Sequence, residues 1–227
     1  MEKKSPKFAV VLAGCGNFDG SELHETITGL LSIDQLGGEY HCFAPDIEQG
    51  KTVNAYKKSI IAVKGEINNR NVLTESARIA RGNIKPLTEL KVSDYDAIIF
   101  PGGQGAISNW CDYALKGINC SVNSEVVRVL KQAHEQQKWI GAMCIAPVIV
   151  AIVLGANSVH VTIGDDSKVA SEIESTGAIH ENRGATEVCI DAKNKVVTTP
   201  CYMLATSIKE IYQGNYALIK TIFDNLA

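Results

Sequence analysis

The sequence has no excess of positive charge, and this absence limits its partners. Its 227 residues contain 22 Lys and Arg against 25 Asp and Glu, so the formal net charge is −3 and the pI is near 6.0. A protein that holds nucleic acid mainly through its phosphates needs a positive field. We therefore expect no nucleic-acid partner. Hydrophobic residues make up 45% and charged residues 21% of the chain, a balance that excludes disorder as the main state.

The cysteines and histidines lack the spacing of metal-binding or disulfide-rich proteins. The seven cysteines are odd in number and include no C-x-x-C, and the five histidines include no H-x-x-x-H or H-E-x-x-H. These absences argue against a zinc site and a disulfide framework, so we expect no metal. Free cysteines are typical of a reducing compartment, and the first apolar run, residues 8–15, is too short for a signal peptide. We therefore expect a cytoplasmic protein.

One long run lacks charge and has to be considered as a membrane segment. Residues 140–156 contain no charged side chain, and about 20 apolar residues are needed to span a bilayer. However, Gly141, Cys144 and Pro147 lie near its start, and no basic cluster flanks it. We interpret this run as a buried strand that turns into a buried helix, and we expect no membrane partner.

Strand-like and helix-like patterns alternate along the chain. We expect strands at 7–13, 40–44, 97–100 and 139–143, a hairpin at 188–199, and helices at 21–36, 71–81, 124–136, 165–177 and from 203 onward. A polar surface insertion at about 47–70 is expected to carry a small hairpin. Strands that alternate with helices predict an α/β fold, a doubly wound sandwich with a mostly parallel sheet and one antiparallel hairpin. Residues 1–227 are expected to form one domain.

The strongest local signal for chemistry is the segment 140–147, in which an apolar strand leads into Cys144 and a helix follows almost at once. Pro147 suits the first turn of that helix, because proline lacks an N–H that would have no partner there. Cys144 is therefore expected at a strand-to-helix elbow, beside the positive end of the helix dipole. This setting predicts a lowered thiol pKa and a nucleophilic sulfur. The alternative is a buried core cysteine.

Two further loops are expected at the carboxyl edge of the sheet, where open α/β proteins bind ligands. The loop 14–20 leads into a helix that carries Glu22 and Glu25 one turn apart near its start. Either carboxylate can act as an acid or base, or simply compensate the helix dipole. The loop 101–105 contains Gly102 and Gly103 and is either an oxyanion site made of backbone N–H groups or only a tight turn.

Other readings of these residues are weaker. The three glycines of the loop 14–20 suggest a nucleotide site, with Asp46 in the place of a ribose-binding acid. Their spacing is one residue longer than G-x-G-x-x-G, and Asp19 would repel a pyrophosphate, so we expect no nucleotide cofactor. His24 and His160 are candidates to reach Cys144, but no spacing predicts either.

Seven segments, spread over nearly the whole chain, carry a family resemblance. They are residues 14–25 (GCGNFDGSELHE), 42–46 (CFAPD), 70–73 (RNVL), 101–103 (PGG), 141–147 (GAMCIAP), 162–164 (TIG) and 198–204 (TTPCYML). Together they resemble the ElbB-type proteins, known as isoprenoid-biosynthesis or lycopene-enhancing proteins. These belong to the PfpI-like, class I glutamine amidotransferase-like superfamily.

The resemblance implies a flavodoxin-like sandwich whose nucleophile elbow holds a reactive cysteine, matched here by Cys144, with a glutamate from the first helix beside it. Glu25 is the first choice, because its distance from the glycines at 37–38 resembles that of the superfamily's glutamate, and Glu22 is the second. Many superfamily proteases and amidotransferases use a histidine directly after the cysteine. That position is Ile145 here, so a hydrolase triad is not expected.

For the ElbB type, the resemblance implies a cofactor-free glyoxalase activity on glyoxal or methylglyoxal, with glycolate or lactate as the product. The cysteine would add to the aldehyde, and the N–H groups of Gly102, Gly103 and Ile145 would hold the oxyanion. Glu25 or Glu22 would move a proton between the two carbons. The expected partners are a small dicarbonyl substrate and, by the same resemblance, a second copy of the chain in a homodimer.

Two other classes of function stay open. In the first, the protein is a non-catalytic redox sensor or regulator linked to isoprenoid biosynthesis, with Cys144 as the sensing thiol. In the second, it is an amidase or deglycase that uses the same cysteine on nitrogen-containing adducts. Cys201 stands where the resemblance predicts a small residue, so this thiol either lies near the site or fills core space.

Overall fold

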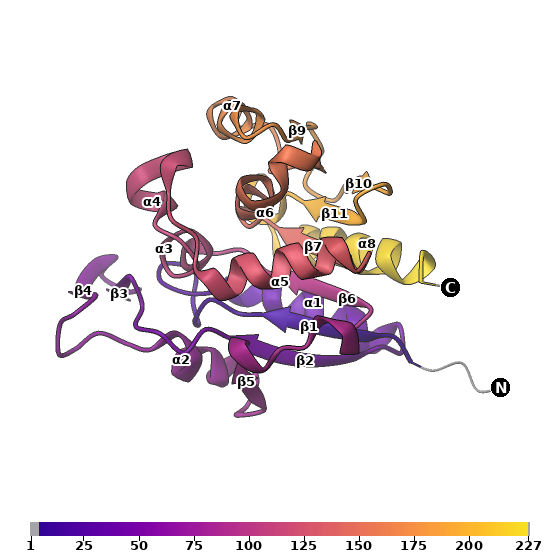
Figure 1. The fold of residues 1–227 in the computed structure, drawn as a ribbon. Helices are drawn as coiled ribbons and strands as arrows, with labels where there is room; N and C mark the ends of the chain where they lie inside the picture. The colour runs from indigo at the N-terminus through magenta and orange to yellow at the C-terminus, as the bar shows by residue number, and fades with distance from the viewer. Residues whose placement is uncertain (1–4, 227) are drawn as a thin grey trace.

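The chain folds around a seven-stranded sheet (Figure 1). The computed structural model describes residues 5–226. The strand order is β10-β11-β7-β6-β1-β2-β5, and β10 is the antiparallel edge strand of an otherwise parallel sheet. The strands are β1 (Lys7–Val11), β2 (Glu39–Ala44), β5 (Ile84–Pro86), β6 (Ala97–Phe100), β7 (Trp139–Met143), β10 (Cys189–Asp191) and β11 (Val196–Thr199). The fold is thus the expected flavodoxin-like α/β sandwich.

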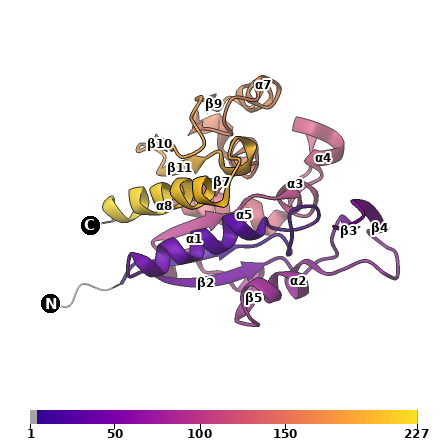
Figure 2. The same ribbon diagram turned by 180° about the vertical axis from the view of Figure 1, so that it is seen from behind.

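Helices cover both faces of this sheet. α1 (Leu23–Gln35) and α8 (Ile208–Asp224) pack side by side on one face (Figure 2), while α5 (Ser124–Glu135) and α6 (Pro147–Leu154) lie on the other. α2 (Val72–Ile79) packs against β2 and β5. The remaining α-helices are α3 (Gln104–Ser108), α4 (Tyr113–Lys116) and α7 (Ser167–Ser175). This arrangement is the doubly wound sandwich of parallel α/β proteins.

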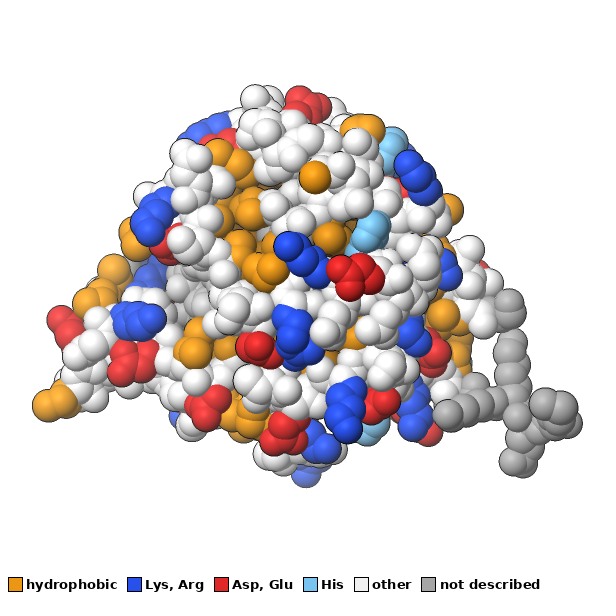
Figure 3. All heavy atoms as spheres, viewed as in Figure 1, with side chains coloured by type: hydrophobic (Ala, Val, Ile, Leu, Met, Phe, Trp, Pro, Cys, Tyr) orange, Lys and Arg blue, Asp and Glu red, His pale blue; other side chains and the backbone are white. Residues whose placement is uncertain are grey.

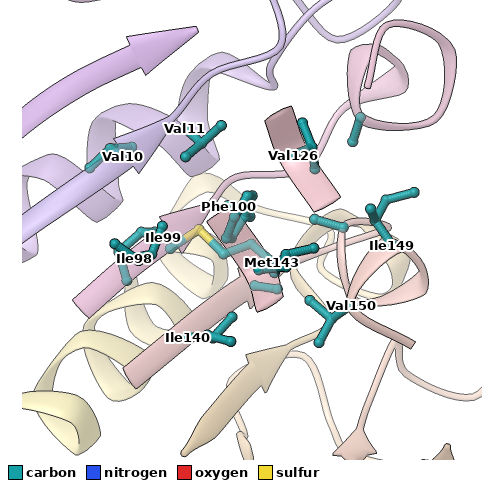
Figure 4. Packing of buried hydrophobic residues seen from close by; sticks show 14 of the residues in the cluster. Val10, Val11, Ile98, Ile99, Phe100, Val126, Ile140, Met143, Ile149 and Val150 are labelled. Atoms are coloured by element: carbon teal, nitrogen blue, oxygen red, sulfur yellow. The ribbon is translucent and has the colours of Figure 1, made fainter. Parts of the chain in front are cut away.

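The central strands are apolar on both sides because helices cover both sides. β6 and β7 are buried along their whole length, and β1 is buried from its second residue onward. Val10, Ile99 and Ile140 are at most 1% exposed and contribute to one continuous core (Figure 4). The near-continuous apolar runs of the sequence have this physical origin.

Two small two-stranded sheets lie outside the main sheet. β3 (Lys51–Asn54) and β4 (Ser59–Val63) form an antiparallel hairpin within residues 47–70 that extends away from the main sheet (Figure 1). β8 (His160–Val161) and β9 (Ile179–His180) pair in parallel. The sequence predicts a strand that opens at His160, where β8 lies, but it gives no sign of β5 and β9, because strands of two or three residues show no recognisable period.

The C-terminal helix starts later than expected. The sequence predicts helix from residue 203, whereas α8 begins at Ile208 and Cys201–Met203 form a short 3₁₀ turn. The side-chain oxygen of Ser207 accepts the backbone N–H of Glu210, and the carboxylate of Glu210 accepts the backbone N–H of Ser207. This capping box defines the start of the helix.

The charge-free run at 140–156 divides between β7 and α6. Among residues 5–226, no helix combines the length and the apolar character needed to cross a membrane.

Candidate active site

Cys144 lies on a strained turn between β7 and α6. Its φ angle is +59°, in the left-handed region that non-glycine residues seldom adopt. Its backbone N–H donates to the carbonyl of Thr199 at 2.9 Å, and this bond ties the turn to β11. Strand β7 ends at Met143 and helix α6 begins at Pro147, so the expected strand-to-helix elbow is present. A strained elbow of this kind presents a side chain above the carboxyl edge of the sheet.

Glu25 lies against the cysteine from the first turn of α1. The residue is 0% exposed, and its carboxyl group hydrogen-bonds the Cys144 thiol. The other contacts of the carboxyl group are backbone donors, because Gly102 N–H reaches Oε2 at 3.1 Å and Tyr202 N–H reaches Oε1 at 3.4 Å. Three separate segments of the chain therefore hold one buried carboxyl group against one sulfur.

Glu22 has a different position and a different task. It is the N-cap of α1, and its Oε2 accepts the backbone N–H of Glu25 at 2.8 Å. Its own N–H donates to the carbonyl of Gly102 at 2.9 Å. These bonds tie the start of α1 to the loop 101–105, the glycine loop. Of the two predicted glutamates, Glu25 contacts the sulfur and Glu22 supports the segment that holds it.

The acid–base properties of the pair follow from burial. Removal from water raises the pKa of Glu25 from 4.5 to about 8, and the nearby negative charge of Glu22 adds to the rise. Burial also raises the pKa of the Cys144 thiol well above its usual value, with the carboxylate of Glu25 as the second cause. At neutral pH, Glu25 therefore holds its proton in most molecules.

This result corrects the expectation of a lowered thiol pKa at the elbow. The backbone N–H groups of Gly103 and Ile145 hydrogen-bond the sulfur and do lower the pKa of Cys144. Their effect is smaller than that of burial beside an acidic group, which the linear sequence does not reveal. Cys144 is 8% exposed. The side chain that hydrogen-bonds its thiol is Glu25, which is itself an acid and therefore does not stabilise the thiolate.

The glycine loop is built for close approach. A Cβ atom on Gly102 would lie 2.4 Å from Cβ of Cys144 and 2.6 Å from Oε2 of Glu25, so a larger residue does not fit. Gly103 has a φ angle of +98°, a conformation that favours glycine. Of the three predicted oxyanion donors, Gly103 and Ile145 direct their N–H groups to the sulfur. The N–H of Gly102 differs from the expectation, because it already donates to Glu25.

Three neighbours of the pair come from the C-terminal part of the chain. Cys201 is fully buried with a φ angle of +45°, and its thiol donates to Oδ1 of Asn215 at 3.1 Å. The amide of Asn215 in turn donates to the backbone carbonyl of Glu25 at 2.8 Å. The Tyr202 hydroxyl lies 2.7 Å from Nδ1 of His24. The sequence analysis missed Asn215, although a polar residue among the apolar positions of α8 was a usable signal.

The other histidine candidate has partners of its own. His160 pairs with Glu181 through Nδ1 at 2.6 Å. Residues 5–226 contain no group of three or more His, Cys, Asp or Glu side chains arranged to hold a metal ion.

Comparisons with known proteins reveal close relatives. No protein-family model matches the chain. The mitochondrial ES1 protein homolog of Rattus norvegicus is 42% identical, and the match covers 96% of this chain and 83% of that protein. The mitochondrial glutamine amidotransferase-like class 1 domain-containing protein 3 of Homo sapiens is 41% identical, and the match covers 98% of this chain and 84% of that protein.

The solved structures show the same fold. An isoprenoid biosynthesis protein with an amidotransferase-like domain from Ehrlichia chaffeensis has a TM-score of 0.87 and 31% identity, covering 96% of this chain and 99% of that one. A Schizosaccharomyces pombe DJ-1 variant has a TM-score of 0.56 and 14% identity, covering 97% and 98% of the two chains. At that identity the likeness concerns the fold alone.

The names of the relatives contradict one expectation. The rat, human and zebrafish (Danio rerio) relatives are all named as mitochondrial proteins. The expectation of a cytoplasmic protein is therefore wrong by this comparison. Free cysteines indicate a reducing environment, and this criterion does not separate the cytosol from other reducing compartments.

Proposed function

The chain belongs to the ES1 family of class I glutamine amidotransferase-like proteins, and from this premise we propose that it is a cofactor-free, cysteine-dependent glyoxalase. It would convert glyoxal to glycolate and methylglyoxal to lactate. The observation that carries the proposal is the fully buried Glu25 carboxyl group hydrogen-bonded to the Cys144 thiol. The chemistry requires a sulfur nucleophile and a group that both takes and gives a proton, and this pair supplies both.

The first step is addition of sulfur to the aldehyde. In the reactive form Glu25 is ionised and accepts the proton of the Cys144 thiol while the sulfur bonds to the carbonyl carbon. The negative charge then lies on the former aldehyde oxygen. The N–H groups of Gly103 and Ile145, which point to the sulfur, are the donors available for this oxyanion. Protonation of the oxygen by Glu25 completes the hemithioacetal and restores the carboxylate.

The second step moves hydrogen between the two carbons. The Glu25 carboxylate removes the proton from the carbon bonded to sulfur, which produces an enediolate. It then returns this proton to the neighbouring carbon, while the hydroxyl proton of the first carbon moves to the oxygen of the neighbouring carbon. The product is a thioester of the 2-hydroxy acid on Cys144. Water hydrolyses this thioester, so one water molecule enters for each dicarbonyl consumed, and the thiol is regenerated.

The pKa of Glu25 suits this double task. With a pKa of about 8, about one tenth of the carboxyl groups are ionised at pH 7, and the protonated majority is a competent acid. A base whose pKa lies near the working pH exchanges protons in both directions at low cost. An ordinary surface glutamate is too weak a base for this role.

The residue after the cysteine also favours an isomerase over a hydrolase. Ile145 offers only a backbone N–H to the sulfur, so the imidazole that activates a hydrolytic cysteine is absent from that position. Proton transfer between adjacent carbons needs one carboxyl group, and the buried position of Glu25 beside Cys144 supports this role.

The test compares three variants with the wild-type protein. Glycolate and lactate are measured after incubation with glyoxal or methylglyoxal. Cys144→Ala should abolish turnover, and Glu25→Gln should lower it by about 10²- to 10⁴-fold, because the amide keeps the shape and loses the base. Glu22→Gln should have a smaller effect, since the Glu22 side chain caps α1. Absence of wild-type turnover, or full activity of Glu25→Gln, would favour the redox-sensor function instead.

A further inference from the structure

A closed loop at residues 111–122 contains two of the seven cysteines. Its ends are joined by an antiparallel bridge between Cys111 and Val122 and by the bond from Asn123 N–H to the Trp110 carbonyl at 2.7 Å. The backbone N–H of Ser121 also donates to the side chain of the residue after Cys111, at 2.7 Å. The loop carries α4 and a short 3₁₀ turn at Gly117–Asn119. Its two arms are therefore held in a defined antiparallel register.

This register brings the two thiols together. Cys111 is opposite Val122, and Cys120 precedes Val122 by two residues, so both cysteine side chains point to the same side of the pair. The bridge and the extended backbone of Cys120 place its thiol beside that of Cys111, and both cysteines are in the free form. The separation of nine positions along the chain gives no hint of this contact.

We propose that Cys111 and Cys120 form an oxidisable dithiol, which hydrogen peroxide converts to an intrachain disulfide that closes the loop. The bridge already holds the two segments side by side, so the ring closes without a long search for a partner thiol. The site is separate from the Cys144 and Glu25 pair and does not depend on the proposed glyoxalase activity.

The surroundings assign a different task to each sulfur. Cys120 is partly exposed, whereas Cys111 is 6% exposed and its thiol donates to the Ala106 carbonyl at 3.6 Å. Burial raises the pKa of the Cys120 thiol, and the carboxylate of Asp112 adds to the rise, while the positive charge of Lys116 opposes it. Burial raises the pKa of Cys111 to about 12. Cys120 is therefore the thiol that meets the oxidant, and Cys111 is the resolving thiol.

The reaction balances with one peroxide molecule. The Cys120 sulfur attacks one peroxide oxygen, the O–O bond breaks, and the products are a sulfenic acid on Cys120 and one water. The Cys111 sulfur then attacks the sulfenic sulfur, the S–O bond breaks, and the hydroxyl group leaves with the Cys111 proton as a second water. Two thiols and one peroxide thus produce one disulfide and two waters.

The loop forms one wall of a surface cavity, which gives oxidation a structural consequence. The cavity has a volume of about 710 Å³ and lies between α4 and the β3–β4 hairpin, with Ile60, Val63 and Leu115 among its apolar lining. Apolar side chains gather along this edge, at the left of Figure 3. A disulfide would fix the wall that carries Cys111 and Leu115 while the hairpin wall stays unchanged.

The experiment uses the full chain, reduced and then treated with hydrogen peroxide. Remaining thiols are blocked with iodoacetamide, and the protein is digested with trypsin without reduction. Trypsin cleaves after Lys116, which lies between the two cysteines, so the disulfide joins two separate peptides. We expect a crosslinked pair that is lighter by two hydrogens than the sum of its peptides, the loss of two of the seven thiols, and reversal by dithiothreitol.

Variants make the outcome decisive. Cys120→Ser and Cys111→Ser should each remove the crosslink, and the partly exposed position of Cys120 keeps its variant foldable should the buried Cys111→Ser fail to fold. Cys15→Ser is the matched control, because Cys15 is also a partly exposed free cysteine, and it should keep the crosslink. Cys111 and Cys120 found free while Cys144 or Cys201 is oxidised, or found paired with other cysteines, would overturn the proposal.

Discussion

Replacing Glu25 by glutamine should stabilise the protein against unfolding in a way that grows with pH. Glutamine has nearly the same shape and accepts the same backbone donors, Gly102 N–H and Tyr202 N–H, but it carries no charge. The wild-type carboxyl group ionises in water when the chain unfolds and resists ionisation in the folded state. The folded state therefore holds a proton that the unfolded state has already released.

The magnitude follows from the pKa of the buried group. Its pKa rises from 4.5 to about 8 on folding, so in this pH window the folded state binds more protons and the stability of the wild-type protein falls as pH rises. Each pKa unit corresponds to about 1.4 kcal/mol, and the full window therefore amounts to at most about 5 kcal/mol. Below pH 4.5 the carboxyl group is protonated in both states and contributes no such penalty.

The assay is urea unfolding of both proteins, followed by circular dichroism, at several values between roughly pH 5 and pH 9. Titrating groups away from the Cys144 and Glu25 pair are common to the two proteins and cancel in the difference. The free energy of unfolding of Glu25→Gln minus that of the wild type should rise from pH 5 to about pH 8 and level off above it. Glu89→Gln, a change at an exposed glutamate, is the control and should show a constant difference.

A difference that stays constant from pH 5 to pH 9 for Glu25→Gln would refute the reasoning. It would mean that the carboxyl group ionises in the folded protein as easily as in water. The same variant is expected to lose glyoxalase turnover, so a gain in stability would accompany the loss of activity. This trade is typical of residues placed for chemistry and not for stability.

Two further predictions test packing and assembly. Gly102→Ala should lower the free energy of unfolding by about 1–3 kcal/mol in the same urea assay, because its Cβ would approach Cβ of Cys144 to 2.4 Å and Oε2 of Glu25 to 2.6 Å; unchanged stability would show that the loop has room the structure does not reveal. The family resemblance implies a homodimer, so light scattering should measure twice the chain mass of 24.5 kDa; a mass near 24.5 kDa at micromolar concentration would contradict it.

The sequence alone determined the fold class of the protein and the position of its central strands. Apolar runs at 7–13, 97–100 and 139–143 predicted the three central strands, because strands covered by helices on both faces are apolar throughout. The same local logic placed Cys144 at an elbow, since Pro147 marks a helix start directly after a buried strand. Features that depend on neighbours within a few residues were readable in this way.

Only the tertiary structure decided what the functional groups do. Glu22 and Glu25 lie one turn apart, and only the family resemblance ranked Glu25 first. In the structure, the extended backbone of Glu22, with a ψ angle of 128°, turns its side chain back onto the helix start, while Glu25 is enclosed by distant segments that contain Gly102 and Tyr202. The same enclosure reversed the expected pKa shift of Cys144. Burial and charge pairing depend on segments far apart in the chain, and they outweigh the local helix dipole.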